Sequence, residues 1–132
     1  DELHASYSTP GAALLVSAPG GDDGFVSNQV TALPGGGCNA VSVGTSFAAP
    51  VVSGVIALML EVNPDLTWRD VHGILAQTSR MITTDPVDTS RVTNAAGFTH
   101  SNFYGFGIID ANASVSAAKS WKLFCPERYL TF

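Results

Sequence analysis

The 132-residue sequence is poor in cysteine and in charge. Two cysteines, Cys38 and Cys125, exclude a disulfide framework and a zinc module with four thiolate ligands. A bridge between the two stays open, because two thiols alone do not define a geometry. Only 13% of the residues are charged, 45% are hydrophobic and the mean hydropathy is +0.23. That composition is too apolar for a disordered chain and suits a segment buried inside something larger.

Basic side chains are scarcer still, with six Lys and Arg against eleven Asp and Glu, a net charge of −5 and a pI near 4.8. Nucleic acid is therefore not expected as a partner, since binding it takes a basic face. Residues 47–62 form the longest apolar stretch, but Pro50, Ser53 and Gly54 interrupt it. It falls short of the ~18 uninterrupted residues of a membrane span. We expect a helix buried on all sides instead.

The length suits one domain with a core of its own. The sequence begins at Asp1 rather than Met, and its opening residues carry no start signal. We therefore expect a fragment or a processed product.

The first 44 residues predict short extended segments separated by glycine-rich turns. The extended segments are residues 12–18, 25–32 and 41–44, with turns at 19–24 and 34–37. A helix then follows over about 46–61, with Pro50 near its start because proline lacks the N–H that would bond the carbonyl four residues back.

Two further helices are indicated by their caps. Thr67 and Asp70 have the spacing of a capping box, and Val71, Ile74, Leu75 and Thr78 then form one helical face. Asp110 can cap a third helix reaching about residue 121, with Ala111, Val115 and Ala118 facing inward. Between them, residues 80–99 are expected to form a polar surface loop. Residues 103–109 alternate glycine with large side chains, which is typical of a buried strand or hairpin where backbones approach closely.

Ser46 stands at the start of the first helix, directly after a glycine-rich extended segment. A serine is a weak nucleophile that needs a base for its proton and donors for the oxyanion. The unpaired N–H groups and the positive dipole end of a helix start are such donors. On the G-x-S pattern alone, however, a simple helix cap is the better interpretation. The elbow of the α/β-hydrolases would have glycine where Ala48 stands.

Longer strings of residues carry more information. GTSFAAPVVSG at 44–54 matches all seven fixed positions of the subtilase active-site motif G-T-S-x-(S/A)-x-P-x-x-(S/A)-G. LEVNPDLTWRDV at 60–71 and YGFGIIDA at 104–111 are similar to strings of the kexin and furin branch, and YS at 7–8 with VSAPGG at 16–21 resembles the strand before the serine loop in bacterial members. The chain thus resembles the subtilisin-like serine proteases, over residues 5–121.

This resemblance implies an α/β fold, the subtilisin-like three-layer sandwich with a mainly parallel sheet. The chain would supply a partial domain, the late strands and three helices. Residues 1–121 would be the C-terminal segment of the catalytic domain. Residues 122–132 would be a tail or a truncated linker.

The resemblance also assigns the site. Ser46 is the expected nucleophile, with Gly44 and Thr45 in its loop. The family's catalytic Asp and His and its oxyanion-hole Asn precede the serine by well over a hundred residues, so an upstream part of the same catalytic domain would supply them. The context of His4 does not match that of the catalytic histidine, which is of H-G-T type, and His72 and His100 are expected to be structural.

Other implications concern ligands and location. No cofactor or metal ligand is expected in this segment, although the family commonly has structural Ca²⁺ sites. The acidic loop at 22–24 is better explained as a plain turn. A peptide or protein substrate, a following P domain and a secreted or extracytoplasmic location are expected by resemblance. The cysteine that pairs with Cys38 in kexin-type members has no counterpart near Gly11, so Cys38 is free or pairs upstream.

Two functions from different classes follow. The first is a serine endopeptidase that works through an acyl-enzyme, with Ser46 as its nucleophile. The alternative is an inactive truncated or pseudoprotease fragment that acts as a binding or folding module. In either case the 132 residues alone are expected to be inactive, because the serine lacks its base.

Overall fold

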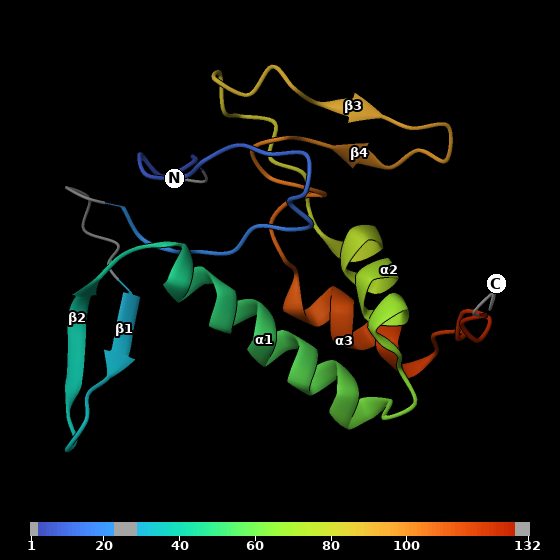
Figure 1. The fold of residues 1–132 in the computed structure, drawn as a ribbon, viewed down its shortest axis with the longest axis horizontal. Coiled ribbons are helices and arrows are strands. Elements are labelled where there is room, and N and C mark those ends of the chain that lie inside the picture. Colours follow the sequence, from blue (N-terminus) through green and yellow to red (C-terminus); the bar gives the residue numbers. More distant parts are fainter. Residues whose placement is uncertain (1–2, 23–28, 129–132) are drawn as a thin grey trace, which may run out of the picture.

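Three helices supply most of the core of this protein. Its structure, a computed structural model, describes residues 3–22 and 29–128 and, for residues 39–42, the backbone alone. The helices are α1 (Thr45–Val62), α2 (Trp68–Thr78) and α3 (Ala111–Lys119). Figure 1 shows α3 lying beside both of the others. The core is apolar and comes mainly from these helices: Val55, Met59, Leu66, Val71, Ile74, Leu75 and Ala118.

Helix α1 confirms the predicted helix within one residue at each end, with Pro50 in its second turn. The expectation that it is buried on all sides is wrong for the described structure. Val55 and Met59 are its buried residues, whereas Leu58 is 49% exposed. A single stripe of α1 faces the core, and no described segment covers the opposite side.

The caps of the other two helices are as predicted. Thr67 and Asp70 form a complete capping box, and Asp110 accepts a hydrogen bond of 2.8 Å from the N–H of Ala113. Helix α3 ends at Lys119, two residues before the predicted end at about residue 121. Ala111, which was expected to face the core, is exposed. The buried face passes instead through Ser114 and Ala118, one helical turn apart.

Two antiparallel hairpins make up the regular strands of the described chain. β1 (Gln29–Ala32) pairs with β2 (Cys38–Ser42), and β3 (Val92–Thr93) pairs with β4 (Thr99–His100). β1 confirms the end of the expected extended segment 25–32, of which residues 25–28 lie outside the described residues. The subtilisin-like sandwich with a mainly parallel sheet stays a prediction for the whole domain.

The strand expected over residues 12–18 is wrong in extent. The N–H of Leu14 bonds the Gly11 carbonyl at 3.2 Å, so the first residues turn instead of extending. Only the end of the segment runs parallel to residues 106–109. The Phe106 N–H bonds the Leu15 carbonyl at 2.7 Å, and the Ser17 N–H bonds the Gly107 carbonyl at 2.8 Å.

Close backbone approach over residues 103–109 is confirmed at two glycines. A Cβ on Gly105 would lie 2.3 Å from the Leu15 carbonyl oxygen, and one on Gly107 would lie 2.3 Å from the Arg80 carbonyl oxygen. Both have positive φ, +62° and +122°. This segment therefore holds residues 15–17 and Arg80 on its two sides.

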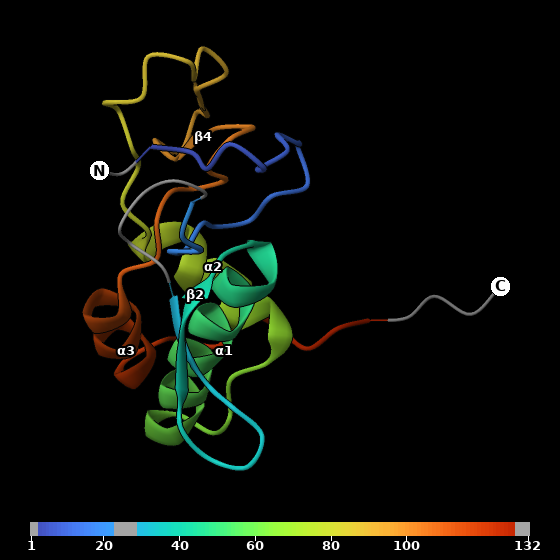
Figure 2. The same cartoon turned by 90° about the vertical axis from the view of Figure 1, so that its left-hand side faces the viewer.

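The N-terminal segment lies beside β4 at one end of the molecule, and the helices occupy the other (Figure 1, Figure 2). The surface loop expected over residues 80–99 is wrong in part, because Ile82, Asp85 and Asp88 are buried and β3 lies within it. Cys38 and Cys125 are both exposed free thiols, so no bridge joins them.

Candidate active site

Ser46 is the second residue of α1, and its side chain is exposed. The N-cap residue is Gly44, at φ 136°, and the cap has no side-chain hydrogen bond. The interpretation of Ser46 as a simple helix cap is therefore wrong. No described residue bonds its hydroxyl, which leaves Oγ accessible at the start of the helix.

The backbone N–H and the backbone carbonyl of Gly44 both form hydrogen bonds. Its N–H bonds the Gly20 carbonyl at 2.8 Å and the Tyr7 hydroxyl at 3.1 Å. Its carbonyl accepts from the N–H of Phe47 at 3.0 Å, which starts the helix. The turn that carries Ser46 is thus fixed to the segment at residue 20.

The first N–H groups of α1 can stabilise an anion beside Ser46. Within the described parts of the chain, no backbone acceptor bonds the N–H of Thr45 or Ser46. Such unpaired donors and the positive end of the helix dipole favour developing negative charge. This is the donor type that the oxyanion of acyl transfer requires.

Each of the three histidines is engaged elsewhere. His4 Nδ1 lies 2.8 Å from Asp85 Oδ2, His72 Nδ1 lies 2.7 Å from the Trp68 carbonyl, and His100 Nε2 lies 2.9 Å from the Leu14 carbonyl. None of these contacts reaches Ser46. A general base for Ser46 is not provided by the described residues.

Asp85 and Asp88 are buried carboxylates that sequence analysis missed. Asp85 accepts from the Tyr104 hydroxyl at 2.6 Å and from the Val87 N–H at 2.9 Å. Asp88 accepts from Ser101 Oγ at 2.7 Å. Each also bonds the N–H two residues ahead, and this D-x-x turn pattern is the signal that could have located them.

Burial by itself raises the pKa of Asp85, because it disfavours the charged form. The hydrogen bonds donated by Tyr104, Val87 and His4 outweigh it and hold this pKa well below its usual range. The same burial, together with the Asp85 carboxylate, raises the pKa of Tyr104. The cluster ties the N-terminal segment to residues 85–104 and is a structural network.

Metal ligands do not converge anywhere in the described ranges, where no group of three His, Cys, Asp or Glu side chains is found. Asp22 accepts from Ser6 Oγ at 2.7 Å. The rest of the loop considered for calcium, Asp23 and Gly24, lies outside the described residues.

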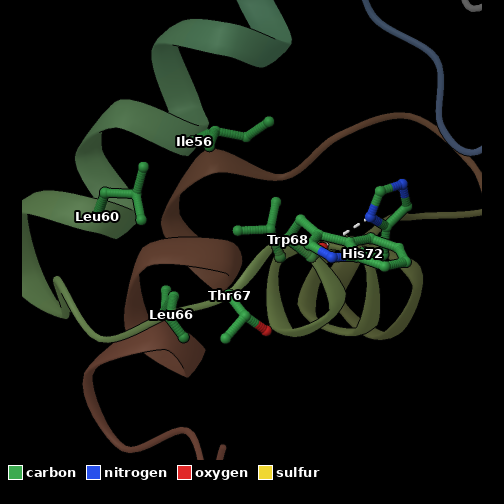
Figure 3. A pocket seen from close by; sticks show the side chains of 7 residues that line it. Ile56, Leu60, Leu66, Thr67, Trp68 and His72 are labelled. Carbon is green, nitrogen blue, oxygen red and sulfur yellow. Dashed lines mark hydrogen bonds between the residues drawn. The ribbon is translucent and has the colours of Figure 1, made fainter. Parts of the chain in front are cut away.

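An apolar groove of about 380 Å³ lies between α1 and α2, far along α1 from Ser46. Figure 3 shows its lining: Ile56, Leu60, Leu66, Thr67, Trp68, Val71 and His72. Trp68 and His72 meet edge to face with ring centroids 5.5 Å apart. The groove's one imidazole, His72, is engaged with the Trp68 carbonyl and not with Ser46.

Comparison with known proteins decides the family. The sequence matches the subtilase family over residues 2–107. The chain belongs to this family. Among curated proteins this subtilase is 47% identical over 94 residues to the PC3-like endoprotease variant B of Hydra vulgaris, covering 71% of the chain and 13% of that protein. It is 41% identical over 119 residues to human proprotein convertase subtilisin/kexin type 7, and the match covers 87% of this chain and 15% of that protein.

The fold is shared with solved subtilases. A serine protease of Aeromonas sobria matches with a TM-score of 0.84 at 27% identity, covering 96% of this chain and 29% of that one. A second structure of that protease, in complex with the chaperone ORF2, matches with a TM-score of 0.79. The chain thus has a subtilisin-like fold and spans less than a third of each of these proteins.

Helix α1 has the length and mean hydropathy of a membrane span: its mean hydropathy is 1.7 over 18 residues, of which 11% are buried. Core helices of soluble proteins meet the same criteria, so this is weak support for a span.

Proposed function

We propose that this chain contributes the nucleophile, Ser46, to a subtilisin-type serine endopeptidase. The observation that carries the proposal is the state of Ser46. Its hydroxyl is exposed and unused in the cap of α1, inside a string with all seven fixed positions of the family's serine motif. A serine retained only for folding would be expected to cap or pack.

The reaction proposed is acyl transfer. Ser46 Oγ attacks the scissile carbonyl while a histidine takes its proton, and the Thr45 and Ser46 N–H groups face the oxyanion. The leaving amine receives that proton, and water then releases the acyl group. The histidine, its aspartate and the oxyanion-hole asparagine would come from an upstream part of the same domain.

Further features follow from the family and are proposed with the activity. They are a peptide or protein substrate, structural Ca²⁺, a following P domain and a secreted or extracytoplasmic location. Residues 1–121 would belong to the catalytic domain, and 122–132 would form a tail or linker. Phe124 nevertheless packs on α2, since a Cβ on Gly73 would lie 2.8 Å from its ring.

A pair of serine variants in one helix tests the proposal. Ser46→Ala in the full-length protein should abolish peptidase activity and covalent labelling by a fluorophosphonate probe. Ser53→Ala is the matched control. Its hydroxyl donates to the Ala49 carbonyl at 3.2 Å, and the family motif accepts alanine at that position. The Ser53→Ala variant should keep both the peptidase activity and the fluorophosphonate labelling.

The alternative, an inactive binding or folding module, makes the opposite prediction for the wild type. Such a full-length protein would fold without any labelling of Ser46. Labelling that persists in Ser46→Ala would also overturn the proposal, because the nucleophile would then be another residue.

A further inference from the structure

Tyr7 lies far from Ser46 in the sequence, yet its hydroxyl contacts the residue that caps the serine helix. The hydroxyl accepts from the Gly44 N–H at 3.1 Å. It donates toward two neighbouring carbonyls, that of Gly20 at 2.9 Å and that of Gly21 at 2.6 Å. A phenol has one O–H donor and an oxygen that accepts, and both functions are used here.

The Tyr7 hydroxyl, the Gly44 N–H and the Gly20 carbonyl are all hydrogen-bonded to one another. The Gly44 N–H also bonds the Gly20 carbonyl at 2.8 Å, so the hydroxyl of Tyr7 joins two segments that already touch. The two segments pack closely at Gly20. A Cβ on Gly20 would lie 2.9 Å from the Tyr7 oxygen, 3.0 Å from the Gly44 carbonyl oxygen and 3.5 Å from Ala48 Cβ. The segment at residue 20 therefore packs directly on the first turn of α1.

The consequence reaches Ser46 through the backbone. Gly44 has a φ of 136°. Because glycine can adopt many other backbone conformations, contacts with neighbouring residues must hold Gly44 in this one. Only Thr45 lies between Gly44 and Ser46, which carries the nucleophilic Oγ. A rotation at Gly44 thus moves the nucleophile and the two free helix donors together.

We propose that Tyr7 is a positioning residue that fixes the orientation of the Ser46 turn. The proposal rests on the proposed function of Ser46 and adds the group that aligns it. Misplacing a reacting atom by ~1 Å can cost about 100-fold in rate. Removing one of the two anchors of Gly44 should cause a smaller shift, with a rate loss of about tenfold.

The test compares Tyr7→Phe with Tyr104→Phe in the full-length protein. Each removes one tyrosine hydroxyl that bonds within the fold, and Tyr104 bonds Asp85 rather than the serine turn. The readout is the rate constant for phosphonylation of Ser46 by a fluorophosphonate, in which the Oγ–P bond forms, fluoride leaves and the base takes the hydroxyl proton. The rate is measured on the folded fraction, beside kcat and KM for a peptide substrate.

For Tyr7→Phe we expect phosphonylation and kcat to fall about tenfold with KM unchanged, because only alignment for attack is lost. Tyr104→Phe should lower the melting temperature and leave the rate within about twofold. Gly20→Ala, which presses on the Tyr7 oxygen and on Gly44, should lower the rate as Tyr7→Phe does. This second variant tests the same contact from the opposite side.

A wild-type rate in Tyr7→Phe, or an equal loss in Tyr104→Phe, would overturn the positioning role. Either result leaves Ser46 as the nucleophile as long as Ser46→Ala is unlabelled. If Ser46→Ala is still labelled, the proposed function itself fails. The two failures are therefore distinguishable in one set of variants.

Discussion

Asp70 joins three parts of the chain through one buried carboxylate. It accepts from the Thr67 N–H at 2.9 Å, from Trp121 Nε1 at 3.0 Å and from the Phe124 N–H at 2.7 Å. Burial raises the pKa of this carboxyl, but the hydrogen bonds from Thr67, Phe124 and Trp121 outweigh it and lower the pKa to about 2. The charged form is therefore the stable one in the folded state.

The pH dependence follows from that direction. The pKa is 3.8 in the unfolded chain and about 2 in the fold, so the unfolded state binds more protons between these values. The stabilisation by Asp70, about 2 kcal/mol, is complete above pH ~4 and is lost as the pH falls to ~2. Urea unfolding of the full-length wild type and of full-length Asp70→Asn should differ by this amount at pH 6 and converge near pH 2.

Asp65→Asn is the matched control for that series. Its side chain is exposed at the turn before α2, and the variant should follow the wild-type curve within about 0.5 kcal/mol at every pH. A gap between wild type and Asp70→Asn that stays constant down to pH 2 would contradict the assignment.

Residues 104–109 pack closely on the backbone of Arg80, and Gly107 makes this contact possible. Gly107 has φ 122°, and a Cβ there would lie 2.3 Å from the Arg80 carbonyl oxygen. Because that neighbour is backbone, the clash can be relieved only by separating the two segments. Gly107→Ala should therefore destabilise the full-length protein by about 3 kcal/mol or more in urea unfolding.

Gly11→Ala provides the comparison, since a Cβ there meets nothing within 4 Å and its φ is not positive. It should be close to neutral. Equal stability of the two alanine variants would show that residues 104–109 do not pack on Arg80 as described.

The elements that could be predicted from sequence are those that local signals specify. The capping box at Thr67 and the cap at Asp110 set two helix starts correctly, because the partners lie within one turn of the chain. The burial of Asp85 and Asp88 could not be predicted. Their partners Tyr104 and Ser101 are 19 and 13 residues away, and polar composition alone suggested a surface loop.

The same distinction holds for the candidate site. Ser46 was located by a contiguous motif at a helix start. Tyr7 was noted only as part of a resemblance, since its bond to Gly44 spans 37 residues. No periodicity indicates such a contact.

At the scale of the whole molecule, the described chain leaves α1 largely uncovered. Val51, Leu58, Leu60 and Val62 are each at least 36% exposed. Large bare apolar patches are rare on soluble monomers. We expect the isolated 132-residue polypeptide to bind the dye ANS and to lack a sharp thermal transition by near-UV circular dichroism. A cooperative, two-state melting curve without dye binding would contradict this.

The central claim is that Ser46 is the nucleophile of a subtilase whose base lies outside these residues. It is tested most directly by treating the full-length protein and the isolated chain with a fluorophosphonate and mapping the adduct by peptide mass spectrometry. We expect stoichiometric modification of Ser46 in the full-length protein and none in the isolated chain. An adduct on a different residue, or stoichiometric labelling of Ser46 in the isolated chain, would contradict it.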